Sequence, residues 1–417
     1  MKFEDYHFAK EIKQSLNEMN FKRPTDIQFK AIPSILKGED VLAIAQTGTG
    51  KTAAFAIPIL HKLHYAIQKN KEENRIKCLV MVPTRELALQ ITEVFTALAV
   101  HTELVILCTF GGVSQDPQIE ELSFGIDVLI STPGRMFDLR SQGHIDISKV
   151  EILVLDEADH MLALGFLQDI HDVVRHLPRK HQTLFFSATI DEKIKEVAYS
   201  LVHNAIRIQI SPKDPVSKNV DHAVAFIEMD DKRFFLERII RERADEKILV
   251  FVRTKVRAER VQKAMERVGI ETITLHGDKN QEERFEALEN FKQGIKKVLI
   301  ATDLSARGID VAGVKLVVNY DLPDVAENYV HRVGRTGRGV EKGQALSFCS
   351  PEEKDILTEI ESFLDKEIKV MQVSKSEYSM TKILTNEAKN DWQKLINDAA
   401  IEDAKWKSSH PKKNKKK

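Results

Sequence analysis

The sequence predicts an α/β protein of two tandem domains, each a mostly parallel sheet covered by helices on both faces. Short runs rich in β-branched residues alternate with longer stretches of helical periodicity, which is typical of parallel α/β units. The strand-like runs are apolar on both faces, as in sheets that lie between two layers of helices. Residues 211–219, "SPKDPVSKN", contain two prolines and no apolar pattern, and they separate two such series.

The strand candidates fall into two groups. The first half contains "DVLAIA", "KCLVMVP", "ELVILCTF", "DVLISTP", "EILVLD" and "QTLFFSAT", and the second contains "KILVFV", "TITLHG", "KKVLIATD", "KLVVNYDLP" and "QALSFCS". We therefore expect a first domain at residues 1–210, an interdomain linker at 211–219, a second domain at 220–370 and a helical, basic extension at 371–417. Open parallel sheets bind ligands beyond the carboxyl ends of their strands, so a cleft between the domains is the expected place for a site.

The composition is that of a globular, cytoplasmic protein with no membrane segment. Of 417 residues, 42% are hydrophobic and 30% are charged. The start, "MKFEDYHF", lacks the apolar stretch of a secretory signal, and the longest apolar run, Ala53–Leu60, is far too short to span a bilayer. Cys78, Cys108 and Cys349 lie in strand-like runs, which predicts buried free thiols in a reducing cytoplasm. No Cys/His cluster has the spacing of a metal site.

The extension has two features. One predicted helix face carries Ala388, Trp392, Leu395, Ile396 and Ala399, and it either packs on the second domain or docks a partner protein. Residues 405–417 contain seven Lys and no acid. Because the whole chain has a net charge of −1, the residues before this tail carry a net charge of −8. This tail is either a contact for a polyanion or a solvated end.

A phosphate-binding loop follows the first strand candidate. In "AIAQTGTGKTAAF", four residues separate Ala45 from Gly50-Lys51-Thr52, which matches a P-loop with Ala in place of its first Gly. Glycines let backbone N–H groups approach phosphate oxygens, Lys51 supplies charge to the β and γ phosphates, and Thr52 offers a hydroxyl to Mg²⁺ at a helix N-terminus. We assign the loop to ATP binding: Gln46, Thr47, Gly48, Thr49, Gly50, Lys51 and Thr52.

Carboxylates end a buried strand in "VEILVLDEADHML", residues 150–162. Placing them there is costly unless a positive group comes to meet them. In P-loop NTPases this strand end carries a second Mg²⁺ contact, which we assign to Asp156. Glu157, the next residue, is then placed to orient and deprotonate the water that attacks the γ-phosphate.

The ordered motifs "AQTGTGKT", "PTREL", "TPGR", "DEAD", "SAT", "ATDLSARGID" and "HRVGRTGR" resemble those of the DEAD-box RNA helicases, and the wording resembles that of bacterial members. The resemblance covers about residues 1–350. It implies two RecA-like domains, ATP and Mg²⁺ as cofactors, and RNA as the partner. The activity it implies is RNA-stimulated ATP hydrolysis coupled to domain closure on a single strand and to local separation of short duplexes.

The resemblance implies further nucleotide contacts. "FKRPTDIQ", residues 21–28, resembles the family's adenine-reading segment, in which Phe21 stacks on the base, Gln28 reads its edge and Arg23 lies between them. Taken alone, Phe21 also fits a core aromatic. The family often has Gly where this chain has Asn20, and Phe3 stands at the position of its upstream aromatic.

In the second half, the resemblance makes Arg335 and Arg338 arginine fingers for the transferred phosphoryl group. Asp310 contacts the ribose, with Gly308 beside it. His331 belongs to a network that couples ATP to RNA. Its other members are Asp159, Ser187 and Thr189.

The RNA contacts that the resemblance implies lie on both domains. They are Thr84, Arg85, Gly111, Gly112, Thr132, Gly134 and Arg135 on the first domain, and Arg253, Gln281, Arg284, Thr302 and Asp303 on the second. Most of these residue types contact a nucleic-acid backbone, which predicts binding that is independent of sequence. Contacts to 2′-hydroxyls select RNA over DNA.

Two other functions fit the same motifs. One is an RNA clamp or scaffold whose ATP cycle times release without unwinding. The other is an ATP-driven DNA helicase or translocase, against which the adenine-reading segment and the "DEAD" run both count. Measuring strand displacement together with ATPase activity distinguishes an RNA clamp from a helicase. Comparing RNA with DNA as activators of ATP hydrolysis distinguishes a DNA helicase from an RNA helicase.

Overall fold

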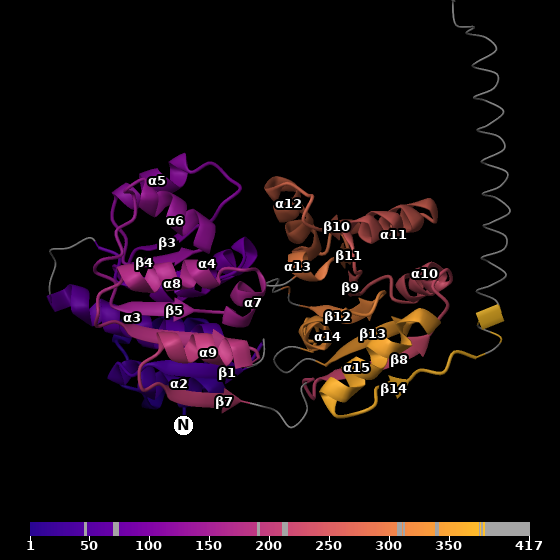
Figure 1. Ribbon diagram of the computed structural model, residues 1–417, viewed down its shortest axis with the longest axis horizontal. Helices are drawn as coiled ribbons and strands as arrows, with labels where there is room; N and C mark the ends of the chain where they lie inside the picture. Colours follow the sequence, from indigo (N-terminus) through magenta and orange to yellow (C-terminus); the bar gives the residue numbers. More distant parts are fainter. Residues whose placement is uncertain are drawn as a thin grey trace, which may run out of the picture.

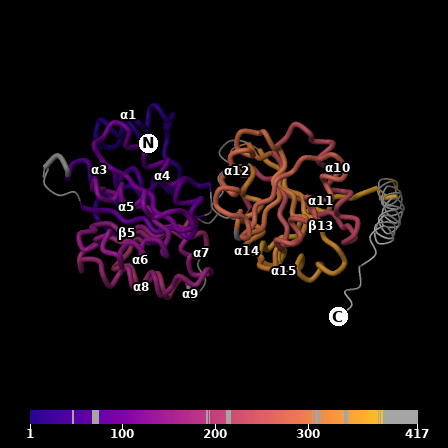
Figure 2. The backbone as a smooth tube through the Cα atoms, turned by 90° about the horizontal axis from the view of Figure 1, so that it is seen from above, coloured from indigo at the N-terminus to yellow at the C-terminus, as the bar shows by residue number. Residues whose placement is uncertain are grey.

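In the computed structural model the chain forms two α/β lobes that lie side by side (Figure 1, Figure 2). The structure describes residues 1–45, 48–69, 75–189, 192–210, 216–306, 311, 313–337, 342–374, 376, 378 and 379. Each lobe is built around one seven-stranded sheet, and every strand pairing within the two sheets is parallel. The expectation of two tandem parallel α/β units is therefore confirmed.

The first sheet has the strand order β3-β4-β2-β5-β6-β1-β7. Its strands are β1 (Val41–Ala45), β2 (Cys78–Met81), β3 (Ile106–Thr109), β4 (Val128–Ser131), β5 (Ile152–Leu155), β6 (Gln182–Ser187) and β7 (Ile206–Ile210). Alternate residues of β1 enter opposite hydrophobic clusters, with Val41 and Ala43 on one face and Leu42 and Ile44 on the other. The continuous apolar runs in the sequence follow from this burial on both faces.

Helices cover both faces of the first sheet, with α1, α3 and α4 on one side and α6, α8 and α9 on the other (Figure 2). The helical elements are η1 (Phe3–Asp5), α1 (Lys10–Glu18), α2 (Asp26–Lys37), α3 (Lys51–Lys69), α4 (Arg85–Ala99), α5 (Asp116–Ser123), α6 (Pro133–Ser141), α7 (Ala158–Ala163), α8 (Leu167–His176) and α9 (Glu192–Leu201). Because α3, α4, α6 and α7 each begin just beyond the carboxyl end of a strand, their N-termini gather at one edge of the sheet.

The second sheet has the order β10-β11-β9-β12-β13-β8-β14, so its strands follow the same chain pattern as those of the first. The strands are β8 (Val220–Phe226), β9 (Lys247–Phe251), β10 (Ile273–Leu275), β11 (Val298–Ala301), β12 (Val314–Asn319), β13 (Gly343–Cys349) and β14 (Lys369–Val370). The helices are α10 (Lys232–Glu242), α11 (Lys255–Arg267), α12 (Gln281–Lys292), α13 (Asp303–Ala306), α14 (Ala326–Val333), η2 (Pro351–Glu353) and α15 (Lys354–Leu364). One core cluster contains residues of α10 and α11, and the other contains residues of α12, α14 and α15.

All eleven strand candidates form strands, but the structure adds β7, β8 and β14, which sequence analysis missed. β7 pairs with β1 at an edge of the first sheet, and its Arg207 is exposed, so its sequence does not read as a buried run. β14 has only two residues, and it forms because β8 supplies a pairing edge. In both cases the neighbouring strand, rather than local propensity, decides the conformation.

Several expectations lie outside the described residues. Residues 211–215 of the linker, the helix face from Ala388 to Ala399 and the Lys-rich tail are among them. The domain boundaries therefore stay a prediction, although the first sheet ends at Ile210 and the second begins at Val220. All three cysteines are free, with Cys78 and Cys349 buried and Cys108 half-buried. Among the described helices, none has the length and apolarity needed to cross a bilayer.

Candidate active site and nucleic-acid interface

The phosphate-binding loop lies between β1 and α3. Gly48 and Gly50 take φ values of 78° and 91°, the left-handed region that favours glycine. A Cβ atom at Gly50 would also stand 2.5 Å from Nε2 of Gln28, so only glycine fits there. Thr49 and Thr52 lie in the same loop and first helical turn, while Gln46 and Thr47 lie outside the described residues.

Lys51, the first residue of α3, is 7% exposed, and its Nζ atom has no hydrogen-bond partner among the residues that the structure describes. A buried ammonium group without a partner is costly, so its position needs a ligand to justify it. Its charge acts on Asp156 and Glu157 at the end of β5. The structure thus brings the P-loop lysine and the two strand-end carboxylates together, as the sequence predicts.

The two carboxylates have different acidities. Burial raises the pKa of Asp156 to about 6, although the charge of Lys51 opposes this rise. Burial also acts to raise the pKa of Glu157, but the contact with His160 and the charges of Lys51 and Arg335 outweigh it and hold that pKa at about 2. Glu157 is therefore ionised at neutral pH. With a pKa of about 6, Asp156 is also mainly ionised at pH 7, but it takes up a proton before Glu157 as the pH falls.

Glu157 has a strained backbone, with φ 51° and ψ 47° in the left-handed region. This conformation costs a non-glycine residue on the order of 1–2 kcal/mol and persists only where the surroundings impose it. The Glu157 N–H donates to Oδ1 of Asp156 at 3.0 Å, and Oε2 of Glu157 lies 3.5 Å from Nδ1 of His160. His160 is buried beside Glu157, and this contact helps to lower the pKa of the Glu157 carboxyl.

The predicted adenine-reading segment is joined to the phosphate loop. Gln28 accepts a hydrogen bond from the Thr25 N–H at 2.9 Å and donates from Nε2 to the Gly50 carbonyl at 3.1 Å. Phe21 is half-buried and contacts the ring of Phe3 at 5.9 Å, edge to face. Arg23 is exposed. Asn20, where the family often has Gly, has a φ of 58°, which Asn tolerates better than most residues.

The predicted coupling residues of the first domain form one cluster. Oδ2 of Asp159 accepts from the Thr189 hydroxyl at 3.1 Å, and from the backbone N–H groups of Ala188 and Thr189 at 3.2 and 3.1 Å. The Ser187 hydroxyl donates to the Thr189 carbonyl at 2.7 Å. The end of "DEAD" is thus tied directly to "SAT". His331 lies half-buried on α14 of the second domain.

The second domain presents Arg335 to this site. Arg335 follows α14, is buried, and donates from Nε to the His331 carbonyl at 3.2 Å. Its charge helps to lower the pKa of Glu157, so the two domains face each other here. Arg338, Gly308 and Asp310 lie outside the described residues.

The predicted RNA contacts of the first domain lie just beyond the strand ends. Thr84 caps α4 by accepting from the Leu87 N–H at 3.3 Å, and Thr132 precedes α6. Gly112 has a φ of 79°, and a Cβ atom there would collide with the guanidinium group of Arg85. Arg135 donates from Nη2 to the Val113 carbonyl at 2.8 Å, which ties the loop that contains Gly111 and Gly112 to α6. Gly134, in the first turn of α6, has open space around it.

On the second domain, Arg253 and Asp303, two of the predicted RNA contacts, are held by ion pairs. Arg253 is paired through Nε with Asp324 at 2.9 Å and through Nη2 with Glu353 at 3.3 Å. The Asp303 carboxylate accepts hydrogen bonds from Nε and Nη2 of Arg332, at 2.5 and 2.7 Å. Thr302 lies beside Asp303, just after β11.

Two polar contacts cross between the domains. Arg85 donates to Oε1 of Gln281, and Arg284 donates to Oε1 of Glu86 at 2.6 Å. Three of these four residues are predicted RNA contacts, and the structure shows that they also hold the domains together. The motif "PTREL" by itself predicts no role for Glu86. Its burial, which the sequence does not show, marks it as a contact residue.

Arg332 is a second residue that sequence analysis missed, although it lies in "HRVGRTGR". It is 1% exposed and fixes Asp303, and it donates to the Asp321 carbonyl at 2.7 Å. Its role is therefore to hold the second domain's strand ends together, in contrast to the predicted role of its neighbour Arg335. Motif spacing alone does not separate these two roles.

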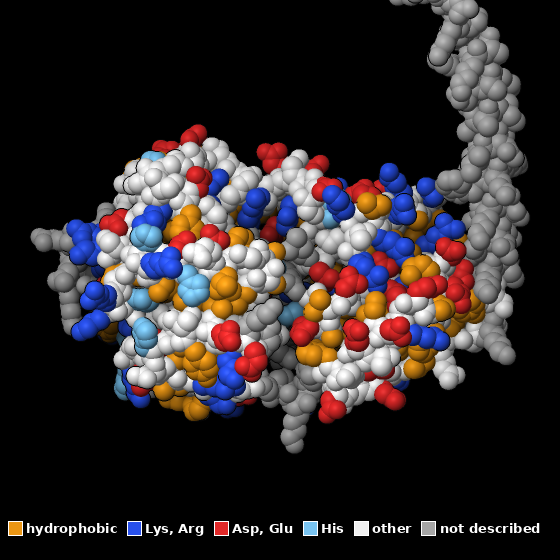
Figure 3. All heavy atoms as spheres, in the orientation of Figure 1, with side chains coloured by type: hydrophobic (Ala, Val, Ile, Leu, Met, Phe, Trp, Pro, Cys, Tyr) orange, Lys and Arg blue, Asp and Glu red, His pale blue; other side chains and the backbone are white. Residues whose placement is uncertain are grey.

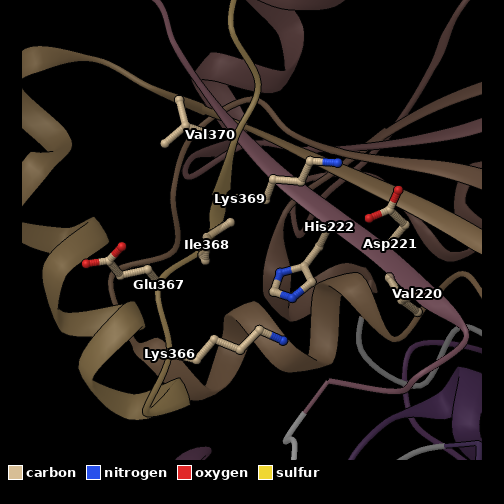
Figure 4. A pocket seen from close by; sticks show the side chains of 8 residues that line it. All are labelled: Val220, Asp221, His222, Lys366, Glu367, Ile368, Lys369 and Val370. Atoms are coloured by element: carbon tan, nitrogen blue, oxygen red, sulfur yellow. The ribbon is translucent and has the colours of Figure 1, made fainter.

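Two surface features lie away from these residues. A pocket of about 440 Å³ between β8 and the segment after α15 is lined by eight residues, none of them a predicted site residue (Figure 4): Val220, Asp221, His222, Lys366, Glu367, Ile368, Lys369 and Val370. On the face shown in Figure 3, basic and acidic side chains are interspersed over both lobes. Within the described part of the chain, no group of three or more His, Cys, Asp or Glu residues could hold a metal ion by itself.

Comparison with known proteins agrees with this arrangement. Residues 25–197 match the family model of the DEAD/DEAH box helicase, and residues 231–340 match that of the helicase conserved C-terminal domain. The chain is 40% identical over 372 residues to the ATP-dependent RNA helicase RhlB of Shewanella sp. (strain MR-4), covering 88% of this chain and 85% of that protein. It is 38% identical to the DEAD-box ATP-dependent RNA helicase RhpA of Helicobacter pylori (strain ATCC 700392 / 26695), covering 89% and 74%.

Solved structures give the same result. S. cerevisiae Dbp5 bound to RNA and ADP BeF3 superposes with a TM-score of 0.81 at 30% identity, covering 92% of this chain and 99% of that one. Mss116p bound to single-stranded RNA and AMP-PNP also has a TM-score of 0.81, at 27% identity, covering 91% and 80%. Both sheets of this chain are therefore the RecA-like domains that the sequence resemblance implied. The chain belongs to the DEAD/DEAH box helicase family and is one of its DEAD-box ATP-dependent RNA helicases.

Proposed function

We propose that the first domain binds ATP and positions the attacking water, and that the second domain supplies the remaining charge only when the two domains meet. The observation that carries this proposal is the buried Lys51 ammonium group, whose Nζ atom has no hydrogen-bond partner in the described part of the chain and whose charge acts on Asp156 and Glu157. Phosphate oxygens supply the missing hydrogen bonds. The predicted contacts of Phe21, Arg23 and Gln28 with adenine belong to the same proposal.

Glu157 orients the water and accepts its proton. It is ionised at neutral pH, and its backbone is held in place by Asp156 on one side and its side chain by His160 on the other. A positioned general base contributes on the order of 10²–10⁴-fold to the rate. Arg335 then stabilises the charge that develops on the transferred phosphoryl group. We assign Arg338 the same role.

We further propose that Thr52 and Asp156 hold Mg²⁺ together with the nucleotide. The donor set fits, because a hydroxyl and a carboxylate are oxygen ligands and Mg²⁺ in such sites is bound by few protein groups and by substrate phosphates. Bound Mg²⁺ would neutralise phosphate charge. The raised pKa of Asp156 also fits a carboxylate whose partner cation comes with the substrate.

RNA binding extends this scheme to the edge of the two sheets. The predicted contacts follow strands β2, β3, β4, β9, β10 and β11, and the contacts Arg85–Gln281 and Glu86–Arg284 join the two halves of that edge. We propose that closure on ATP aligns them into one backbone-binding surface. Asp159, Thr189 and His331 would transmit closure between the ATP and RNA sites.

The three free thiols fit a reducing compartment, and we propose that the protein acts in the cytoplasm. The function is tested by measuring ATP hydrolysis with a panel of single-stranded and duplex RNAs and with matched DNAs, beside strand displacement. We expect turnover to rise with RNA and much less with DNA, and short duplexes to separate only when ATP is present. Stimulation without displacement would identify an RNA clamp, and equal stimulation by DNA would overturn RNA selectivity.

A further inference from the structure

An aromatic contact crosses between the domains beside the two polar contacts. Phe110 follows β3 in the first domain, and Phe285 lies in the second turn of α12 in the second domain. Their ring centroids are 6.3 Å apart with an interplanar angle of 71°, an edge-to-face arrangement that aromatic rings prefer. Both side chains are half-buried.

The first domain holds Phe110 in place by its own contacts. The side chain of Gln118, which is 8% exposed, accepts from the Phe110 N–H at 3.2 Å and donates to the Phe110 carbonyl at 3.2 Å. Three residues further along, the Val113 carbonyl accepts from Arg135. The first domain therefore fixes the backbone that carries the ring by its own contacts, which limits the conformational entropy lost when the second domain meets it.

Phe285 is presented with similar rigidity. Helix α12 begins at a capping box, in which Asn280 accepts from the Glu283 N–H at 2.9 Å and Glu283 accepts from the Asn280 N–H at 2.9 Å. The preceding residue, Arg284, is the one that reaches Glu86. The ring thus approaches the first domain together with a charged contact that fixes its register.

We propose that Phe110 and Phe285 form an aromatic clasp that positions the second domain in the closed state. The contact joins two domains, so it exists only when they meet and its free energy favours that state alone. The polar contacts beside it fix the register of the two domains, and the two rings add the free energy of removing apolar surface from water. Both are positioning residues, since neither belongs to the phosphate site. The inference rests on the closure described under the proposed function.

The test is a double-mutant cycle in the full chain with Phe110→Ala, Phe285→Ala and the double variant. RNA affinity is measured with a non-hydrolysable ATP analogue, beside ATP affinity without RNA and turnover across RNA concentrations. We expect each single variant to weaken RNA binding about 2- to 10-fold, the range of one aromatic pair. Turnover at saturating RNA should stay within about twofold, and ATP affinity without RNA should not change. The double variant should be no weaker than the weaker single variant, because one contact is lost in all three.

Two controls separate the clasp from a general effect. Phe285→Tyr keeps the ring and should bind RNA as the wild type does, and Phe363→Ala removes a 40% exposed aromatic from α15 of the same domain and should change nothing. Matching thermal unfolding curves show that each variant folds. Losses that multiply in the double variant, or an equal loss of RNA affinity without nucleotide, would overturn the clasp. A wild type without RNA-stimulated turnover would instead refute the proposed function.

Discussion

The two domains place a lysine at the same point of the same fold, but of these two lysines only Lys51 lacks a hydrogen-bond partner within the described residues. Lys51 is the first residue of α3 after β1, and Lys232 is the first residue of α10 after β8; β1 and β8 occupy the same place in their sheets. Lys51 Nζ has no hydrogen-bond partner, whereas Lys232 Nζ donates to Glu353 at 2.5 Å and to the Tyr320 carbonyl at 2.8 Å.

The strand-end carboxylates differ in the same way. Asp156 follows β5, and Asp321 follows β12, the strand at the matching place in the second sheet. Asp321 lies 3.8 Å from Lys232 and 3.0 Å from Arg257, so its charge is neutralised by its own domain. The second domain fills with its own side chains the space that the first keeps for a nucleotide. Unsatisfied charge therefore marks the chemical site better than the fold does.

Removing Lys51 should give the largest functional effect. Lys51→Ala leaves the phosphates without their cation, and we expect RNA-stimulated ATP hydrolysis to be abolished. Because Nζ makes no hydrogen bond within the protein, thermal unfolding should change little. Turnover and a melting curve on the same preparation test both parts, and wild-type turnover in this variant would show that the phosphate site is elsewhere.

Arg335→Ala tests whether the second domain contributes charge only on closure. An arginine finger is worth roughly 10³–10⁵ in rate, so single-turnover hydrolysis should fall by about that factor. ATP affinity without RNA should be kept, since ATP is bound by the first domain. If Arg335→Ala lowered ATP affinity as much as the rate of hydrolysis, Arg335 would not be a group that the second domain supplies only on closure.

Glu157→Gln keeps the shape of the site and removes the proton acceptor. We expect hydrolysis to slow by roughly 10²–10⁴-fold while ATP stays bound, so that a closed complex remains on RNA for longer. The dissociation rate of labelled RNA in the presence of ATP reports this directly. Release at the wild-type rate would remove Glu157 from the proposed role.

Lys232→Met should affect stability more than chemistry. Lys232 is 0% exposed and Glu353 is 2% exposed, and removing one partner of a buried pair costs about 3–5 kcal/mol. Chemical denaturation should show this loss, while ATP affinity without RNA should hold. The double variant Lys232→Met/Glu353→Gln removes both charges and should recover much of the stability. If Lys232→Met were as stable as the wild type, the Lys232–Glu353 pair would not stabilise the second domain, and the contrast with Lys51 would fail.

Sequence reasoning predicted which groups of the first domain lie close together because they are local in the chain, and their roles stay a prediction. The P-loop and "DEAD" each place several functional groups within a few residues, and parallel strand order brings them to one edge. The Asp159–Thr189 cluster was also implied, and the structure places its members in contact. The edge strands and the partners of Lys232 were not predicted. Glu353 is far from Lys232 in the chain, and nothing in "SPEEKD" distinguishes it from a solvated acid.

The same limit explains Arg332 and Phe285. Arg332 and Arg335 are three residues apart in one motif, yet burial beside Asp303 gives Arg332 a structural role. Phe285 reads as an ordinary helical aromatic until its contact with Phe110 of the other domain is known. Contacts between distant segments decide these roles, and a single sequence does not contain them.

The smallest expected effect comes from the Lys-rich tail, whose seven cations lie in a run without any acid. Deleting residues 405–417 should weaken RNA binding and leave hydrolysis at saturating RNA unchanged, because the lysines lie outside every ATP motif. Lysines in such a run neutralise phosphates without reading bases, so the loss should be the same for different RNA sequences. For single strands each neutralised phosphate adds about 0.7 to the salt slope, so full engagement of the tail would account for roughly 5. Affinities of both proteins across a salt series measure this difference. Identical slopes would leave the tail without a part in RNA binding and would confine recognition to the edge of the two sheets.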